Sequence, residues 1–136
     1  MSPADVARVL ERGRYRVSTE ALLQADIAHV LEAAGLPFGR EVQLSKSDRI
    51  DFVVAESIGI EAKTRCNKRS IWRQIERYAT HESISALILI TGTPVGLPPE
   101  VNGKPLYFVS LGSTFLRVFS AILPTIRKVT LGKLLN

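Results

Sequence analysis

The segment R-I-D-F-V-V-A-E-S-I-G-I-E-A-K, residues 49–63, constrains the fold of this chain more than any other. It contains two short apolar runs separated by Ala55-Glu56-Ser57, and this pattern predicts two strands joined by a tight turn. We place the strands at about 49–55 and 58–64. Strands joined by so short a turn pair antiparallel, so each residue of the first strand has a defined partner on the second.

Three charged residues occupy positions where this hairpin brings side chains together. The register that follows from the turn sets Phe52 opposite Ile60 and Asp51 opposite Glu61. Directly opposed side chains on an antiparallel pair lie about 5 Å apart, so two carboxylates at these positions repel each other. Lys63 follows Glu61 by two residues and therefore projects from the same face. A divalent metal ion would explain why two carboxylates and an ammonium group are held this close.

Composition narrows the class of protein. The 136 residues, 46% of them hydrophobic and 23% charged, fit one folded domain with a hydrophobic core. The formal net charge of +5 favours a polyanion partner such as a nucleic acid. A single cysteine excludes an internal disulfide and a multi-cysteine zinc site. Because neither a signal peptide nor a membrane-spanning apolar run is visible, we expect a cytoplasmic protein that does not contact a membrane.

Helical and strand patterns alternate along the chain. We expect helices over about 3–12, 19–34, 71–81 and 114–123, and strands over about 41–44, 49–55, 58–64, 85–91 and 105–111. The strand–helix–strand order between residues 58 and 91 implies a right-handed crossover within one sheet. The predicted fold is a single α/β domain over residues 1–136, with a mixed sheet of about five strands flanked by helices. Its core spans about 18–111, followed by a C-terminal extension over about 112–136.

Two polar residues lie on the predicted inner faces of helices. Glu20 precedes Leu23 by three residues and Ile27 by seven, which places it on the buried stripe of its helix, facing the sheet. The alternative is that Glu20 only complements the positive end of the helix. Gln74 lies beside the inward position Ile75 of the next helix, where a buried amide must find hydrogen-bond partners.

This combination of residues and elements resembles the PD-(D/E)XK nuclease superfamily, most closely its small phage-type and Holliday-junction-resolvase-like members. The resemblance covers about residues 18–91, and the position before the aspartate carries Ile50 where the family pattern has proline. It implies a restriction-endonuclease-like core and a metal-dependent DNA endonuclease, selective for branched or junction DNA. The residues that carry the family pattern are Asp51, Glu61-Ala62-Lys63, the first-helix Glu20, and the Gln-x-x-x-Tyr pair Gln74 and Tyr78.

The resemblance implies a metal site in this hairpin. Asp51 and Glu61 would bind Mg²⁺, which Mn²⁺ can replace, together with the backbone carbonyl of Ala62. Glu20 would help directly or through a water molecule. Mg²⁺ prefers oxygen ligands and is commonly held by one or two carboxylates, several waters and substrate phosphate, so these residue types suit it.

The resemblance also implies roles around the metal. Lys63 would orient the attacking water or stabilise the charge of the pentacoordinate phosphate, and Gln74 would support the water or the phosphate. A basic loop and helix start follow Lys63, where phosphate binding competes with the alternative of an ordinary solvated loop. The residues expected to contact nucleic acid are Arg65, Lys68, Arg69, Arg73 and Tyr78.

Other residues with chemical potential receive simpler interpretations. Trp72 can stack on a base, but packing within the protein is the more common role of tryptophan. Cys66 and the histidines His29 and His81 show no catalytic or metal-binding spacing, and we expect both histidines to point outward from helices. Small nucleases of this type cut two strands with two active sites, which implies a homodimer. The apolar region over residues 115–135 would be its interface or part of the core.

Two other functions fit the same residues. The first is a catalytically inactive nuclease-fold module that binds nucleic acid or serves as a subunit of a larger DNA-processing complex. The second is an unrelated α/β interaction protein in which the charges form structural salt bridges. This second alternative predicts that Lys63 directly neutralises Asp51 and Glu61.

Overall fold

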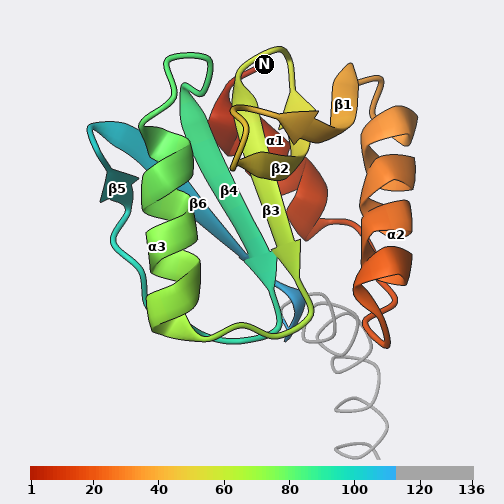
Figure 1. The fold of residues 1–136 in the computed structure, drawn as a ribbon. Helices are drawn as coiled ribbons and strands as arrows, with labels where there is room; N and C mark the ends of the chain where they lie inside the picture. Colours follow the sequence, from red (N-terminus) through yellow and green to blue (C-terminus); the bar gives the residue numbers. More distant parts are fainter. Residues whose placement is uncertain (113–136) are drawn as a thin grey trace, which may run out of the picture.

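A six-stranded mixed sheet with helices on both faces organises residues 1–112, the part of the chain that the computed structural model describes (Figure 1). The predicted α/β class and mixed sheet are confirmed. The helices are α1 (Pro3–Glu11), α2 (Glu20–Ala33) and α3 (Lys68–Ala79). The strands are β1 (Phe38–Gln43), β2 (Arg49–Val54), β3 (Ile58–Lys63), β4 (Ala86–Thr91), β5 (Glu100–Val101) and β6 (Lys104–Ser110).

The sheet has the order β1–β2–β3–β4–β6–β5. The pairs β1–β2, β2–β3 and β5–β6 are antiparallel, whereas β3–β4 and β4–β6 are parallel. The expected crossover is therefore present, because α3 connects the parallel strands β3 and β4. All residues of β4 are buried, as its continuous apolar sequence A-L-I-L-I-T requires in the middle of a covered sheet. Among residues 1–112, no helix has both the length and the apolar character needed to cross a lipid bilayer.

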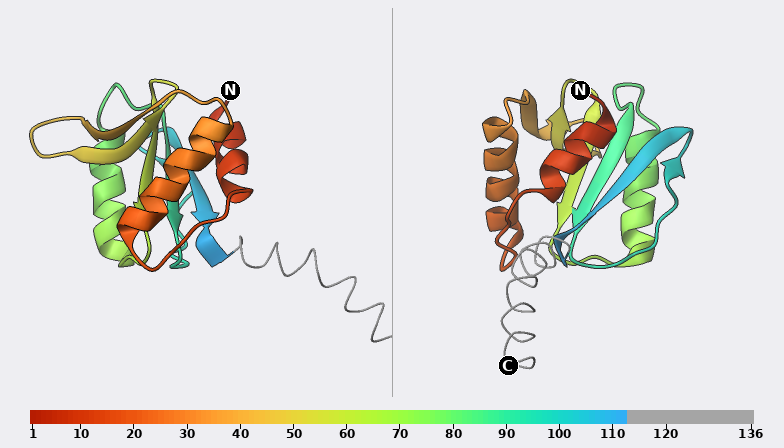
Figure 2. Two further views of the ribbon diagram at one scale, coloured as in Figure 1. Left: turned by 90° about the vertical axis from the view of Figure 1, so that its right-hand side faces the viewer. Right: turned by 180° about the vertical axis from the view of Figure 1, so that it is seen from behind.

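Two hydrophobic cores lie on opposite faces of the sheet. Helices α1 and α2 cover one face, and α3 covers the other (Figure 2). Alternation along β3 sends Ile58 and Ile60 into the first core. Gly59 faces α3 instead, and a Cβ atom there would lie only 2.5 Å from Cδ1 of Ile50. The same alternation turns Glu61 toward α3.

The structure differs from the sequence prediction in several boundaries. A sixth strand, β5, lies between the strands predicted over 85–91 and 105–111, where the sequence predicted no further strand. Helix α3 begins three residues earlier than predicted, because the side chain of Asn67 caps it by accepting a hydrogen bond from the Ser70 amide at 3.2 Å. The predicted helix over 114–123 and the apolar region over 115–135 lie outside residues 1–112.

One end of the sheet gathers the features expected of a ligand site. The carboxyl ends of β3, β4 and β6 lie at this end, together with the N-termini of α2 and α3 (Figure 1). Ligands of α/β sheets commonly bind beyond the carboxyl ends of the parallel strands. Helix N-termini also carry partial positive charge that favours anions.

Candidate functional site

Strands β2 and β3 separate where the two predicted carboxylates stand. Their ladder runs from Val54 opposite Ile58 to Phe52 opposite Ile60, as the sequence register predicted, and ends there. Beyond that point the side chains of Asp51 and Glu61 replace the missing backbone partners.

The replacement is reciprocal. The Ala62 amide donates to Oδ2 of Asp51 at 2.8 Å, and the Asp51 amide donates to Oε1 of Glu61 at 3.4 Å. Both carboxylates thus lie where β2 and β3 separate, and each accepts a hydrogen bond from a backbone amide of the opposite strand.

Residues of α3 hold Glu61 from above the sheet. The Glu61 side chain is almost fully buried, with 1% of the residue exposed, and its Oε2 lies 3.1 Å from the Tyr78 hydroxyl. That hydroxyl also lies 2.9 Å from the Arg49 carbonyl oxygen and accepts a hydrogen bond from Gln74 Nε2 at 2.8 Å. A phenol has one proton to donate, so the Arg49 carbonyl and Glu61 compete for it. Gln74 and Tyr78 therefore act on the site through Glu61.

Burial determines the protonation of Glu61. Removal from water, then the charge of Asp51 and the hydrogen bond with it, raise the pKa of Glu61 to about 8, against the smaller opposing effects of Lys63 and Tyr78. Burial and the neighbouring Glu61 charge also raise the pKa of Tyr78. In the metal-free protein, Glu61 therefore retains a proton at neutral pH and shares the site with Asp51 without full repulsion.

Lys63 is half-buried at the end of β3. Its charge lowers the pKa of Glu61, which places it within electrostatic reach of the carboxylates. Yet none of the four salt bridges found in residues 1–112 includes Lys63. The direct salt bridge required by the structural alternative is not formed, and the ammonium group is available to another anion.

Glu20 departs from its prediction. It is the first residue of α2, directly after the N-cap Thr19, and it is exposed rather than buried against the sheet. Side chains of a helix point toward its N-terminus, so Glu20 projects beyond the helix, and the buried stripe begins one turn later at Leu23. In residues 1–112, no three or more His, Cys, Asp and Glu residues are grouped to hold a metal, so Glu20 is not a third carboxylate beside Asp51 and Glu61.

The predicted nucleic-acid contacts divide into two groups. Tyr78 was wrongly included, because only 1% of it is exposed and its hydroxyl is engaged by Glu61 and Arg49. The remaining four are exposed, and none belongs to a salt bridge found in residues 1–112. They are Arg65, Lys68, Arg69 and Arg73, at the loop after β3 and the first turns of α3.

Sequence reasoning missed a polar cluster beside the site. Asp48, in the turn before β2, is buried, with His81 Nε2 2.9 Å from its Oδ2 and Arg77 Nε 3.2 Å from its Oδ1. The hydrogen bond with His81, followed by the Arg77 contact, lowers the pKa of the Asp48 carboxyl group despite its burial. His81 therefore does not simply point outward. Partners 29 and 33 residues away leave no local signal in the sequence.

Comparisons with known proteins leave the family open. No model of a known protein family matches the chain, and searches of curated proteins and of solved structures also found no match. The resemblance to nucleases consequently rests on the residue pattern, and the geometry of Asp51, Glu61 and Lys63 is the basis for any functional proposal.

Proposed function

We propose that this protein is a metal-dependent DNA endonuclease that hydrolyses phosphodiester bonds, with selectivity for branched or junction DNA. The observation that carries the proposal is the buried Glu61 held beside Asp51, with its pKa raised to about 8. Burying a carboxyl group beside another carboxylate costs stability, so a function that requires both groups would explain why the pair is kept. Strongly shifted pKa values of this kind are concentrated at functional sites.

The residues fit a hard divalent cation. Asp51 and Glu61 supply two carboxylates, and the Ala62 backbone, whose amide binds Asp51, adjoins them. Two carboxylates with water molecules and substrate phosphate are a common Mg²⁺ environment in enzymes, and Mn²⁺ accepts the same ligands. When bound, the metal would neutralise charge on the phosphate and lower the pKa of a coordinated water. A water-mediated contribution from the exposed Glu20 remains part of this proposal.

The surrounding side chains have separate tasks. Lys63, which joins no salt bridge found in residues 1–112, orients the attacking water or stabilises the added negative charge on the phosphate oxygens. The hydrogen bonds from Gln74 to Tyr78 and from Tyr78 toward Glu61 fix the orientation of the Glu61 carboxyl group. Because the raised pKa favours the protonated form of Glu61, a cation bound there would have to displace this proton, and its affinity would rise with pH.

The proposed partners are DNA, suggested by the exposed basic residues, and a second copy of the chain, implied by the resemblance. The four exposed basic residues after β3 would contact DNA phosphates next to the cleavage site. The resemblance implies two active sites for paired cuts in two strands, so the proposal includes a homodimer that acts on DNA in the cytoplasm.

Cleavage assays test this function directly. The protein is incubated with linear, nicked, flapped and four-way-junction DNA in Mg²⁺, Mn²⁺ or EDTA. We expect metal-dependent cutting of the branched substrates and at least a hundredfold loss of rate in Glu61→Gln, Asp51→Asn and Lys63→Ala. The matched control is Glu32→Gln, an exposed carboxyl on α2, which should cut at the wild-type rate.

The outcomes separate the competing functions. Tight DNA binding without cutting of any substrate would favour the catalytically inactive binding module. Absence of both DNA binding and metal affinity, measured by Mn²⁺-dependent thermal stabilisation, would return the site to a structural role. Cutting that survives Asp51→Asn would refute the metal site specifically.

A further inference from the structure

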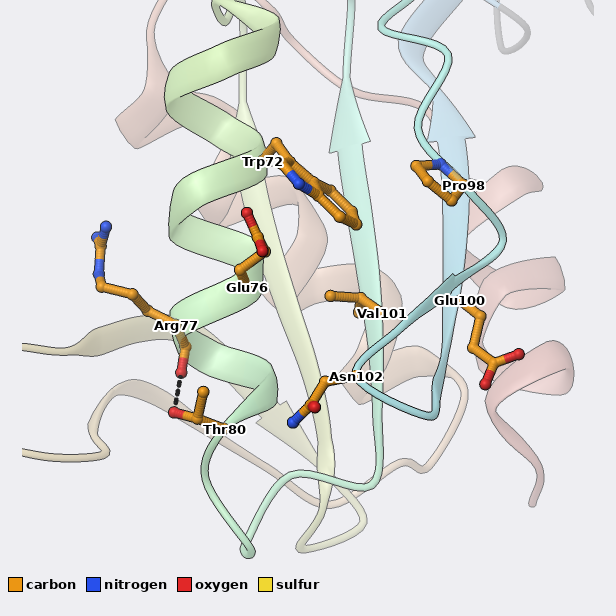
Figure 3. Close-up of a pocket in the computed structure, with 8 residues that line it drawn as sticks. All are labelled: Trp72, Glu76, Arg77, Thr80, Pro98, Glu100, Val101 and Asn102. Carbon is orange, nitrogen blue, oxygen red and sulfur yellow. Dashed lines mark hydrogen bonds between the residues drawn. The ribbon is translucent and has the colours of Figure 1, made fainter.

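A cavity of about 680 Å³ lies between the first turns of α3 and the loop that precedes β5. Trp72, Leu97 and Pro98 form its apolar wall, and Lys68 and Arg69 stand at its basic side. Figure 3 shows the indole of Trp72 extending from α3 toward the loop that carries Pro98. Cavities of this size and apolar lining are typical of small-ligand sites.

Three side chains that line this cavity, those of Trp72, Lys68 and Arg69, can interact with a ligand. Trp72 packs partly against the core beneath α3, and no hydrogen bond or ring contact of Trp72 is found in residues 1–112. Lys68 and Arg69 are exposed, and neither joins a salt bridge within that part of the chain. An aromatic face and two cations are thus open to a ligand with a planar ring and a negative charge.

A second cavity indicates on which side of Trp72 the negative charge of a ligand lies. It measures about 400 Å³, shares Trp72 and Pro98 with the first, and continues toward the C-terminal end of α3. Glu76 and Glu100 lie on this side of Trp72 (Figure 3). Arg77 also lines this second cavity but is paired with Asp48, whereas Lys68 and Arg69 join no salt bridge found in residues 1–112. An anionic group is therefore favoured at the Lys68 and Arg69 side.

We propose that the larger cavity binds an unpaired nucleotide of a DNA strand, with its base stacked on Trp72 and its phosphate beside Lys68 and Arg69. Base stacking on an aromatic ring does not depend on base identity, since every base has a π-face. A paired base cannot reach the ring without leaving its helix. The ligand is therefore DNA with unpaired nucleotides rather than intact duplex.

The position of the cavity relates it to the cleavage site, and in this respect the inference rests on the proposed function. Residues 72 and 74 are about 200° apart on α3, so Trp72 and Gln74 lie on opposite sides of the helix. A helix with its side chains is about 10–12 Å across, the length of about three nucleotides at 3.4 Å each. A strand cut at Glu61 would cross the basic start of α3 and place a nearby unpaired base on Trp72.

The only tryptophan of the chain reports on its own site. In EDTA, we expect single-stranded oligothymidine to quench Trp72 fluorescence saturably, whereas a blunt duplex of the same length and a base-free sugar–phosphate oligomer quench it weakly. Anisotropy of a labelled single strand should show a roughly ten- to hundredfold loss of affinity in Trp72→Ala and a smaller loss in Trp72→Phe. The matched control, Glu76→Gln in the neighbouring cavity, should bind at least as well as the wild type.

The results decide the inference in either direction. Equal quenching by duplex and single strand, or unchanged affinity of a Trp72→Ala protein with a native circular dichroism spectrum, would overturn it. If Trp72→Ala does not fold, Trp72→Leu decides the question, because it keeps an apolar side chain but removes the aromatic face, and affinity equal to that of wild type would count against stacking. Binding is measured without metal, so this test is independent of DNA cleavage. A protein that never cuts DNA could still bind a nucleotide at Trp72. An active nuclease without base-dependent quenching would contradict the nucleotide site while leaving the nuclease function intact.

Discussion

At the scale of single residues, Glu61 shows how burial and charge define a site. One of its oxygens is held by the Asp51 amide and the other lies beside Tyr78, so the carboxyl group is fixed before any ligand arrives. The proton that it retains removes the repulsion from Asp51 in the metal-free protein. That proton makes stability depend on pH in a direction unusual for an acidic residue.

The first prediction concerns this dependence. Folded Glu61 holds its proton up to about pH 8, whereas an unfolded glutamate loses it near pH 4.5. The folded state binds more protons in this window, so the contribution of Glu61 to the free energy of unfolding should fall between these pH values, by a few kcal/mol at most. Urea unfolding in EDTA from pH 4.5 to 9 should show this decline in wild type and much less of it in Glu61→Gln.

Controls isolate the effect of Glu61. Glu32→Gln removes an exposed carboxyl group and should retain the wild-type decline. Parallel curves for wild type and Glu61→Gln would mean that Glu61 is already ionised in the folded protein, and the electrostatic description of the site would be wrong.

At the scale of elements, the β1–β2 hairpin bends over the face of the sheet that carries α3 (Figure 2). Asp48 in its turn binds Arg77 and His81 at the end of α3, while the Tyr78 hydroxyl binds the Arg49 carbonyl. Two contacts therefore attach the start of β2 to α3, next to the Tyr78 hydroxyl that reaches Glu61. The position of Asp51 depends on this attachment because it lies two residues beyond Arg49.

The second prediction is that Asp48→Asn loosens this attachment. We expect a loss of about 1–3 kcal/mol in the free energy of unfolding at pH 7, since Arg77 and His81 lose a buried, charged acceptor. The pKa of Asp48 is lowered from 3.8, so its contribution is present above that value and disappears as the pH falls through the lowered pKa. Urea unfolding at pH 7 and pH 3 measures the difference, which should shrink at pH 3.

Hydrogen exchange localises the change. The amides of Leu44 and Ser45 bond to the Asp48 carbonyl, and they should exchange faster in Asp48→Asn. The exposed Glu82→Gln, next to His81, is the matched control and should leave both stability and exchange unchanged. Equal stability of Asp48→Asn and wild type at pH 7 would contradict the role of this contact.

At the scale of the whole molecule, charge is distributed unevenly around the sheet. The net charge is +5, and four exposed basic residues without carboxylate partners in residues 1–112 stand near the carboxyl end of β3. The N-termini of α2 and α3 lie at the same end of the sheet (Figure 1). This end of the sheet thus combines exposed cations with helix N-termini, an arrangement that favours a polyanion.

The third prediction follows from counterion release. We replace one basic residue at a time by alanine: Arg65, Lys68, Arg69 or Arg73. Each replacement should make the slope of log affinity against log salt concentration less negative, by about 0.9 on duplex DNA and about 0.7 on single strands. Fluorescence anisotropy over a salt series measures the slope. Arg8→Ala on α1, where Arg8 already pairs with Asp5, is the control and should leave it unchanged. Unchanged slopes in all four variants would place the DNA surface elsewhere.

The sequence by itself determined the α/β class, the β2–β3 register and the meeting of Asp51 with Glu61. These features are local, because apolar periodicity and a three-residue turn fix which side chains face each other. Only the tertiary structure decided the exposure of Glu20, the hydrogen bond of the Tyr78 hydroxyl with Glu61 and the binding of Asp48 by His81. Those outcomes depend on how far a helix extends past the sheet and on contacts between residues distant in the chain, which no local pattern encodes.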